Sequence, residues 1–348
     1  MAHPRPARLA EVAKLAGVSP GLVSRIINED PALRVREETR ASVVAAIEML
    51  NYRPNAAARA LRNSQTGLLG FALHDVHDPV YVDMVHAAQA AAASHDYAIM
   101  LIDTADLAER REMIREIVQS RRIDGMLIQT GFGGNDAELQ QLTHSVPTVV
   151  FNGDPAPGIR SIRADDRAAA KLATRYLIDA GHTAIAFFGM HGATAARRFD
   201  GYQAAIAEAG LTPLGPINVG WNSDTAHDAT VQLLRSGTPI TAIVAFTVTT
   251  ALGVSSGIVE SGLRIPDDIS MISLPDTWLA RHLTPPLTVV TMPFDQVGGE
   301  AVAMLIDQIQ SPSAGEVVVR EPLPEIIERG SVHRRADTDL GRRSRGRL

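Results

Sequence analysis

The residues of this sequence with the clearest potential for recognition chemistry lie around position 25. Apolar residues at helical spacing mark the inner face of a short expected helix, at Val23, Ile26 and Ile27. Its outward face carries Gly21, Arg25 and Asn28. A guanidinium can bridge two neighbouring hydrogen-bond acceptors, such as O6 and N7 of a guanine, so Arg25 is a candidate for recognition chemistry. A phosphate contact or a solvated arginine is the alternative interpretation of the same residue.

Three short helices are predicted to position this face. Apolar spacing indicates a helix over 9–16, and Gly17 is placed to end it because glycine readily adopts the left-handed conformation. Ser19 is suited to cap the second helix, with Pro20 at its first position. A third helix is expected over 37–50. Two short helices joined by a turn and braced by a third follow the helix-turn-helix plan, whose second helix enters the major groove.

The same segment carries motifs that together form a family pattern. They read xVAxxAGVS, VSRxxN, TRxxVxxAIxxLNYxPN and a final ARxL. The combination resembles the headpiece of the LacI/GalR (lactose-repressor) family of transcription regulators. The resemblance implies that Arg25 contacts bases, and that Pro20 and Gly21 occupy the two other variable base-reading positions. Because neither has a side-chain donor or acceptor, direct readout is expected to rest on Arg25, helped by DNA shape.

Further DNA contacts follow from the resemblance. It implies phosphate contacts for three residues of the headpiece, Ser19, Ser24 and Asn28, although Ser19 could serve only as a cap. Residues 55–61, after Pro54, resemble the hinge helix of the family, which folds when two copies meet on DNA. Within it Leu61 is implied to wedge into the minor groove, with Asn55, Arg59 and Arg62 beside the backbone. A core position in a longer helix is the alternative for Leu61, but its neighbours offer too little apolar surface.

From residue 66 onward, short apolar segments alternate with helical stretches. Strands are expected at 67–73, 98–102, 125–129, 148–151, 184–189, 217–219, 242–246 and 270–274. The helical stretches include 82–95, 108–121, 166–180 and 198–209. This βαβα pattern, repeated twice, predicts an α/β class with two doubly wound parallel-sheet lobes that face each other across a ligand cleft. The same halves recur in periplasmic sugar-binding proteins, and the family resemblance extends to about residue 330.

The predicted domain organisation follows from these elements. We expect an all-α headpiece over 1–54, a hinge helix and linker over 55–65, and a two-lobed effector-binding and dimerisation core over 66–330. Crossings near 163, 291 and 313 would give a first lobe of about 66–163 and 292–313, and a second of about 164–291 and 314–330. The basic tail over 331–348 is expected to be disordered. It lacks the heptad pattern of a tetramerising coil, so a homodimer is predicted.

The resemblance implies an effector-binding set in the cleft. Arg198 matches the family's effector-binding arginine, and Trp221 matches an aromatic residue that stacks on the ligand. Tyr81, Asn152 and Asp165 are further candidates because they follow strands, although each could be a cap or turn residue. The alternative interpretations are that Arg198 is a surface residue and that Trp221 packs in the core.

Two positions depart from the family pattern in this set. Thr247 and Val248 stand where the family usually has an Asn-Asp pair, and Pro275 with Asp276 stands where it has Asp-Asp. Because proline cannot hold hydroxyl groups as a carboxylate does, a simple sugar is less clearly indicated, and a more apolar ligand, another pose or no ligand stays open.

Composition limits the remaining possibilities. The net charge is −6, yet residues 1–63 carry 10 Lys+Arg against 6 Asp+Glu and residues 329–348 carry 7 against 2. A basic end on an acidic body indicates an anionic partner at that end. The chain has no cysteine, which excludes disulfides and thiolate metal sites. No secretory signal and no apolar run of about 18 residues is visible, so a cytoplasmic protein is expected.

Two other functional classes are less consistent with the sequence. A transport solute-binding protein needs a signal peptide and no headpiece. An enzyme needs a reactive constellation, but GVSPG (17–21) and GVSSG (253–257) do not directly follow strands, as a G-x-S-x-G nucleophile requires. HDVHD (74–78) has metal-binding residue types on a loop that lines the cleft, and exposed loop residues are the simpler interpretation. We therefore predict a non-enzymatic, ligand-responsive repressor without cofactor or metal, with activation as the alternative.

Overall fold

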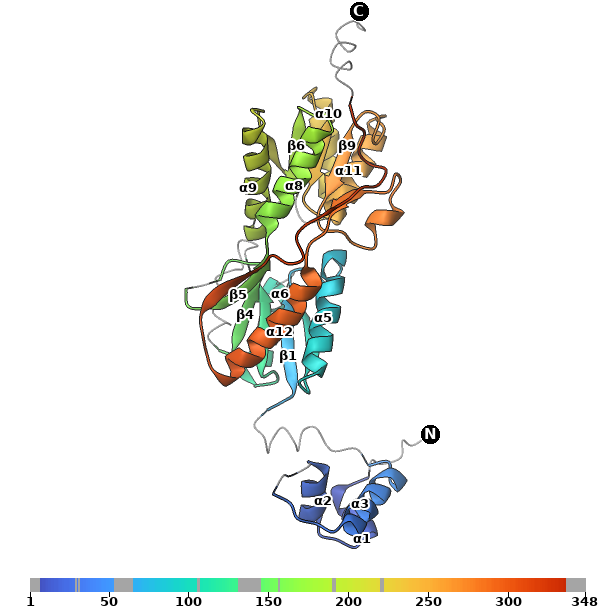
Figure 1. Cartoon of the computed structure of the whole chain (residues 1–348), viewed down its shortest axis with the longest axis vertical. Helices are drawn as coiled ribbons and strands as arrows, with labels where there is room; N and C mark the ends of the chain where they lie inside the picture. Colours follow the sequence, from blue (N-terminus) through green and yellow to red (C-terminus); the bar gives the residue numbers. More distant parts are fainter. Residues whose placement is uncertain are drawn as a thin grey trace, which may run out of the picture. The chain divides into compact units, whose positions relative to one another are not determined.

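The computed structural model describes residues 7–28, 30, 32–52, 65–104, 107–130, 145–155, 157–189, 192–219 and 222–335. The chain divides into two compact units, Met1–Thr66 and Gly67–Leu348, which are labelled by element in Figure 1. The second unit begins at Gly67, one residue after the predicted start of the core. The predicted hinge contacts at Asn55, Arg59 and Leu61 lie outside the described residues, as does Trp221.

The first unit contains the three predicted helices, α1 (Leu9–Ala16), α2 (Pro20–Ile27) and α3 (Glu37–Met49). Gly17 ends α1 with φ +67°, a backbone conformation that costs glycine little. The Ser19 hydroxyl accepts the Leu22 N–H at 3.2 Å, which satisfies a backbone donor at the start of α2. A small apolar core joins the helices through Val12, Ala13, Val23, Ile26, Val43, Ala46 and Tyr52. The helix-turn-helix prediction is confirmed.

The first lobe of the second unit is a six-stranded parallel sheet in the order β11-β5-β4-β3-β1-β2. Its strands are β1 (Leu68–Leu73), β2 (Ala98–Asp103), β3 (Gly125–Gln129), β4 (Thr148–Phe151), β5 (Arg160–Ala164) and β11 (Gly315–Val319). Helices α5 (Val82–Ala93) and α12 (Phe294–Gln310) cover one face, and α6 (Leu107–Gln119) covers the other. Buried aliphatic and aromatic side chains fill the space between sheet and helices. Among them, the rings of Phe71 and Phe151 pack edge to face with their centroids 4.8 Å apart.

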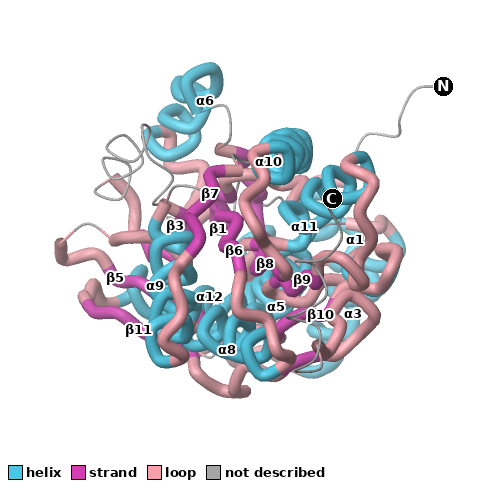
Figure 2. Tube along the Cα trace, turned by 90° about the horizontal axis from the view of Figure 1, so that it is seen from above, coloured by secondary structure: helices cyan, strands magenta, loops and turns pink. Residues whose placement is uncertain are grey.

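The second lobe repeats this plan with the strand order β12-β10-β9-β8-β6-β7. Its strands are β6 (Ile185–Gly189), β7 (Leu214–Asn218), β8 (Ala242–Ala245), β9 (Ser270–Ser273), β10 (Thr288–Val290) and β12 (Ile326–Ile327), of which only β12 is antiparallel to its neighbour. Helices α8 (Asp166–Asp179) and α9 (Ala193–Glu208) lie on one face, and α10 (Ser223–Arg235) and α11 (Val248–Glu260) on the other (Figure 2). The predicted pair of doubly wound lobes is confirmed.

The chain passes between the lobes at three places. The first two, between β5 and α8 and between β10 and α12, lie close to the predicted positions 163 and 291. The third prediction was wrong by several residues, because β11 (Gly315–Val319) still pairs in parallel with β5 of the first sheet. Residues 314–319 therefore belong to the first lobe, and the last crossing lies between β11 and β12. β11 is a half-exposed edge strand whose apolar residues are three valines at its end, so its apolar pattern was too weak to predict a strand.

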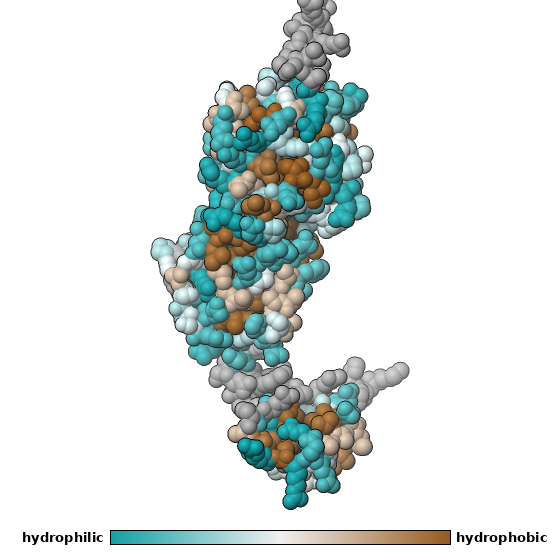
Figure 3. All heavy atoms as spheres, viewed as in Figure 1, coloured by the Kyte–Doolittle hydropathy of each residue, from teal (hydrophilic) through white to brown (hydrophobic). Residues whose placement is uncertain are grey.

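Two short 3₁₀ turns complete the elements, η1 (Pro79–Tyr81) and η2 (Ala280–His282). The face of the second unit that is visible in Figure 3 is mainly hydrophilic, with apolar residues gathered in separate patches. Across the described ranges, no helix combines the length and the apolar character that a bilayer crossing needs.

Candidate functional site

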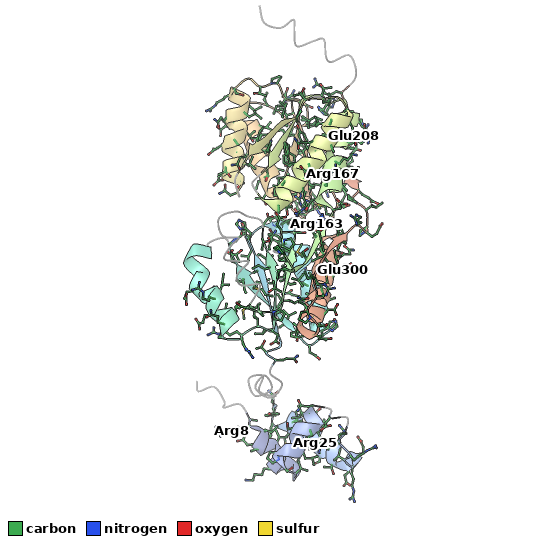
Figure 4. All side chains as sticks on the ribbon, turned by 90° about the vertical axis from the view of Figure 1, so that its left-hand side faces the viewer. Arg8, Arg25, Arg163, Arg167, Glu208 and Glu300 are labelled. Carbon is green, nitrogen blue, oxygen red and sulfur yellow. The ribbon has the colours of Figure 1, made fainter. Side chains whose placement is uncertain are left out.

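The exposed face of α2 is the first candidate site, and Figure 4 labels Arg25 on it. Pro20 and Gly21 are exposed at the start of the helix, so the positions predicted to read bases are open to a partner but offer it no side-chain donor. The Arg25 side chain is 50% exposed, and its Nε donates to Oδ2 of Asp30 at 2.7 Å. That hydrogen bond is the main cause that holds the pKa of Asp30 below its usual value.

The remaining predicted contacts of the headpiece also lie on or near this surface. Ser19 is exposed and caps α2, so both of its predicted interpretations stay compatible with its position. Asn28 ends α2, and its side-chain amide donates to the Ser24 carbonyl oxygen, a bond that stabilises the last turn. Ser24 is half-buried on the same helix. The face therefore offers one half-exposed guanidinium and small polar groups, an arrangement suited to contact with a nucleic acid.

The second candidate site is a cavity of about 50 Å³ between the two lobes. It lies at the carboxyl ends of the strands, where ligands of parallel sheets bind. Side chains and backbone from both lobes line it: His74, Asp75, Asp78, Val80, Tyr81, Gln129, Asn152, Thr194, Arg198, Phe246, Thr247 and Phe294. Because this volume holds only a few water molecules, a ligand of metabolite size requires the lobes to move apart or the lining to rearrange.

Arg198 is the most buried charged group of this cavity, with 1% of its surface exposed. Its Nε donates to Asp166 Oδ1 at 3.0 Å, and its Nη1 donates to the carbonyl oxygens of Phe246 at 2.6 Å and Leu274 at 3.1 Å. Its Nη2 contacts the Met292 sulfur at 3.7 Å. A guanidinium has five N–H groups, so the fold already uses four of them. One Nη2 hydrogen is left for a ligand, which excludes a bidentate grip on a carboxylate while these contacts last.

Contacts that cross between the lobes frame the cavity. Arg197 ion-pairs with the buried Asp166 at 3.1 Å and donates from Nη2 to the Asn152 carbonyl oxygen at 3.2 Å. The Thr194 hydroxyl donates to the same carbonyl at 2.7 Å. On the other side, the Thr249 hydroxyl donates to Asp78 Oδ1 at 3.4 Å. These bonds connect β4 and the loop after β1 in the first lobe to α9 and α11 in the second.

Hydrogen-bond acceptors dominate the polar groups that remain around the cavity. Asn152 is 4% exposed and has φ +48°, and its Oδ1 has no hydrogen-bond partner among the described residues. Such an unpaired buried oxygen costs free energy until something donates to it. The carboxylates of Asp75 and Asp78 add acceptors, and burial raises the pKa of Asp78. The hydroxyl of Tyr81 already donates to Gln129 Oε1 at 2.7 Å.

The structure brings four predicted effector residues together, since Arg198, Tyr81, Asn152 and Thr247 all line the cavity. Thr247 stands where the family usually has a polar pair, and its hydroxyl caps α11 by accepting the Thr250 N–H at 3.1 Å. Its neighbour Val248 is 1% exposed and packs in the core.

Two other predicted residues lie elsewhere. Asp165 caps α8 through the Ala168 N–H at 3.1 Å and faces Arg320 at 3.4 Å. Asp276 accepts two hydrogen bonds from Arg329, at 2.9 and 3.0 Å, and lines a separate cavity of about 570 Å³ with Pro275. Neither aspartate lines the cavity around Arg198, but the cavity that Asp276 lines also lies between the lobes, with Val80 and Asp83 of the first lobe in its lining.

Sequence reasoning did not single out Asp78, Gln129, Phe246 or Phe294 as ligand contacts. The signal for Gln129 and Phe246 was their position, at or directly after the carboxyl end of a strand, and Asp78 lies on the loop that follows β1. Phe294 begins α12 at the second crossing, and no local pattern marked it. Within the described residues, no group of histidine and acidic side chains is placed to hold a metal, and the loop over 74–78 instead uses Asp75 to accept the His77 N–H at 2.8 Å.

Comparisons with known proteins cover both candidate sites. Residues 8–55 match the family model of bacterial regulatory proteins, lacI family, and residues 174–332 match that of a periplasmic binding protein-like domain. The chain is 34% identical over 331 residues to the ribose operon repressor of Escherichia coli (strain K12), covering 93% of this chain and 99% of that protein. It is 32% identical over 338 residues to the HTH-type transcriptional repressor PurR of Vibrio cholerae (serotype O1, strain M66-2), covering 94% and 98%.

The fold has a similarly extensive match. The crystal structure of the lac repressor dimer bound to operator and the anti-inducer ONPF superposes with a TM-score of 0.80 at 25% sequence identity. That match covers 94% of this chain and 100% of the repressor chain. Headpiece and lobes thus occur together in one architecture.

Proposed function

The chain belongs to the LacI family of bacterial regulatory proteins. From this premise we propose that it binds an operator and represses transcription there, and that a small molecule controls the affinity of the protein for this operator. The observation that carries this function is the half-exposed Arg25 on α2, inside a helix-turn-helix that the family model matches in full. The protein is a regulator and not an enzyme, as its relatives are transcriptional repressors. Its place of action is the bacterial cytoplasm, where operator DNA lies.

Operator binding is proposed to use the predicted contact set. Arg25 reads a guanine, while Ser19, Ser24 and Asn28 contact phosphates around it. Two copies bind a pseudo-palindromic site, since the two-fold symmetry of a dimer matches that of its operator. Apolar side chains that are exposed on the second lobe, at Leu252, Val259 and Trp278, support a dimer because a second copy would bury them. The hinge contacts proposed for Asn55, Arg59 and Leu61 follow from the family membership alone.

The effector is proposed to be a donor-rich molecule without a negative charge. Arg198 pairs with Asp166, and Arg197 pairs with both Asp166 and Asp154, so two guanidinium charges face two carboxylate charges. Asp75 and Asp78 therefore leave the lining acidic. Together with Asn152 Oδ1, which has no partner in the described part of the chain, these carboxylates favour hydroxyl or amino groups on the ligand. Phe246 and Phe294 offer apolar walls to its ring or carbon chain. A sugar or related polyol metabolite fits this description, whereas a sugar acid or phosphate ester does not.

Control of DNA binding is proposed to work through lobe movement. The bonds from Arg197 to the Asn152 carbonyl and from Thr249 to Asp78 join the lobes across the cavity. A ligand that enters between them must break or replace these bonds, so it binds the two lobe arrangements with different affinity. Only such a difference can shift the equilibrium and with it the affinity for operator.

The test is selection of binding sites from a random duplex library with the purified full-length protein. We expect a palindromic site with a guanine at a fixed place in each half-site. Binding of that site should then change when a neutral polyol panel is added, and should not change with the matching sugar acids. Enrichment of no site, with and without the panel, would contradict the proposal.

A further inference from the structure

A second residue lies against the base-reading arginine. Arg25 occupies the last turn of α2, and its Nε donates to Oδ2 of Asp30 at 2.7 Å. The Arg25 side chain remains 50% exposed and that of Asp30 is 31% exposed. The hydrogen bond uses the inner N–H of the guanidinium and leaves the two terminal amino groups, Nη1 and Nη2, without a protein contact in the described part of the headpiece.

Asp30 itself is fixed by its own backbone surroundings. Its N–H donates to the Arg25 carbonyl oxygen at 3.1 Å, and its Oδ1 accepts the Ala32 N–H at 2.9 Å. Its carbonyl oxygen accepts the Leu33 N–H at 2.9 Å, which closes a turn directly after α2. One carboxylate oxygen therefore holds the turn and the other holds the guanidinium. Because the pKa of Asp30 is lowered, the carboxylate stays charged over the physiological range.

Fixing Arg25 matters more here than on a helix with several base-reading side chains. Pro20 and Gly21, the exposed residues at the start of α2, have no side-chain donor or acceptor. The long arginine side chain would otherwise lose its rotamer freedom on binding a base. A guanidinium that is already held by Nε can present Nη1 and Nη2 together to O6 and N7 of a guanine.

We propose that Asp30 is a positioning residue for base recognition, which holds Arg25 by Nε so that both terminal amino groups face one guanine. This inference rests on the proposed operator binding. It differs from a general electrostatic effect, because a carboxylate near DNA by itself lowers affinity for every duplex. It also differs from sequestration of Arg25, in which removal of Asp30 would tighten binding to the operator.

The experiment compares full-length variants on the operator that the wild-type protein selects. The position read by Arg25 is defined as the base pair at which Arg25→Ala lowers the base preference most. Asp30→Asn keeps an oxygen for the Ala32 N–H but places an amide donor against Arg25, so it preserves the turn while removing the contact to the guanidinium. Affinities are measured for the four operators that differ only at this base pair, and for a scrambled duplex.

We expect Asp30→Asn to lower the preference for guanine at this base pair about tenfold, at the low end of the value of one bidentate contact. Binding to the scrambled duplex should not weaken. In the Arg25→Ala background, Asp30→Asn should change the base preference less than twofold, because a positioning residue acts only through its partner. Glu38→Gln is the matched control: it removes one exposed acidic charge of the headpiece without touching Arg25, and should alter all duplexes alike.

Three results would overturn the inference. These are an unchanged guanine preference in Asp30→Asn, an equal change on all four operators, and the same loss in the Arg25→Ala background. Each presupposes that the wild-type protein selects an operator. If the wild-type protein selected none, the proposed function would fail first, so the two failures are distinguishable.

Discussion

Arg25 of the headpiece and Arg198 of the inter-lobe cavity show opposite uses of the same side chain. Arg25 is 50% exposed and gives one N–H to an aspartate, whereas Arg198 is 1% exposed and gives its N–H groups to Asp166, two carbonyl oxygens and a sulfur. The first keeps its terminal donors for a partner molecule. Arg198 uses four of its five N–H groups to connect α8 with the ends of β8 and β9 beside the cavity.

The difference in exposure suits Arg25 to recognition of a partner molecule and Arg198 to stabilisation of the fold. A surface arginine contributes little to stability because water and salt screen its charge, so its effect appears in binding. A buried, multiply bonded arginine contributes mainly to the fold, since its removal leaves a carboxylate and carbonyl oxygens without donors. The two regions should therefore respond to mutation and to pH in different ways.

The largest expected effect is on stability, from Arg198→Ala. It removes one of the two arginines that ion-pair with the buried Asp166 in the described structure, and it leaves the carbonyl oxygens of Phe246 and Leu274 without the Arg198 donors. We expect the free energy of unfolding of the two-lobed unit to fall by about 3–5 kcal/mol, the usual cost of breaking a buried ion pair from one side. Urea unfolding followed by circular dichroism measures this loss.

Arg25→Ala is the matched control, because the surface change should leave the same unfolding transition within about 0.5 kcal/mol. If Arg198→Ala lost ligand response at full stability, the distinction between recognition and support would be wrong for this residue. The cavity arginine would then act mainly on the ligand.

A decrease in pH should also affect the stability of the two regions differently. His182 is 2% exposed in the second lobe, and burial lowers its pKa to about 4. Its ring contacts the Thr241 hydroxyl at 3.0 Å and the His333 carbonyl oxygen at 3.1 Å, while Arg335 is the charged neighbour that adds to the shift. The described headpiece contains no histidine.

Because the unfolded chain binds this proton at a higher pH than the folded lobe, stability should fall as pH decreases from about 6.5 to about 4. The loss attributable to His182 approaches roughly 3 kcal/mol at the lower end, as each unit of pKa shift corresponds to about 1.4 kcal/mol. Unfolding measured at several pH values in wild type and His182→Gln checks this. Parallel curves for the two proteins would contradict a neutral, buried His182.

A smaller expected effect concerns DNA alone. Arg25→Lys keeps the positive charge but cannot bridge two acceptors of a guanine. We expect operator affinity to fall by about 1–3 kcal/mol, with little change on a scrambled duplex and none in the unfolding transition. Fluorescence anisotropy at one fixed salt concentration compares both duplexes. Equal losses on both would show that Arg25 contacts phosphate, the alternative interpretation that the sequence left open.

Much of the architecture follows from local patterns in the sequence. The helix-turn-helix was predictable because Gly17 and Ser19 act through their nearest neighbours, and the parallel lobes because buried strands such as β8 are apolar throughout. The edge strand β11 was missed, since its pairing with β5 depends on residues more than a hundred positions away. Four cavity residues were predicted, but Asp165 and Asp276 do not line the cavity, because the partners Arg320 and Arg329 that hold them come from distant segments.

The smallest expected effect concerns Asp78 of the cavity, whose pKa is shifted in the opposite direction to that of Asp30 in the headpiece. The pKa of Asp30 is lowered by Arg25, while burial raises that of Asp78, which faces Val80 N–H, Thr249, Asp75 and Arg198. A carboxyl with a raised pKa destabilises the fold when ionised, so the penalty is present above its folded pKa and absent below about 3.8. Asp78→Asn should therefore stabilise the lobes at pH 7 by about 1 kcal/mol or less, because weaker bonds from Val80 N–H and Thr249 to the neutral side chain offset part of the gain.

Asn keeps an oxygen for the Val80 N–H, so the turn before α5 should persist in this variant. The gain should shrink as the pH approaches 4, and Asp75→Asn, whose side chain is 40% exposed, should show no comparable gain. Urea unfolding of both variants at pH 7 and pH 4 gives the comparison. A loss of stability at pH 7 in Asp78→Asn would mean that the charge of Asp78 supports the closed lobes through Thr249 and Arg198, and that the cavity is built around an ionised carboxylate even without ligand.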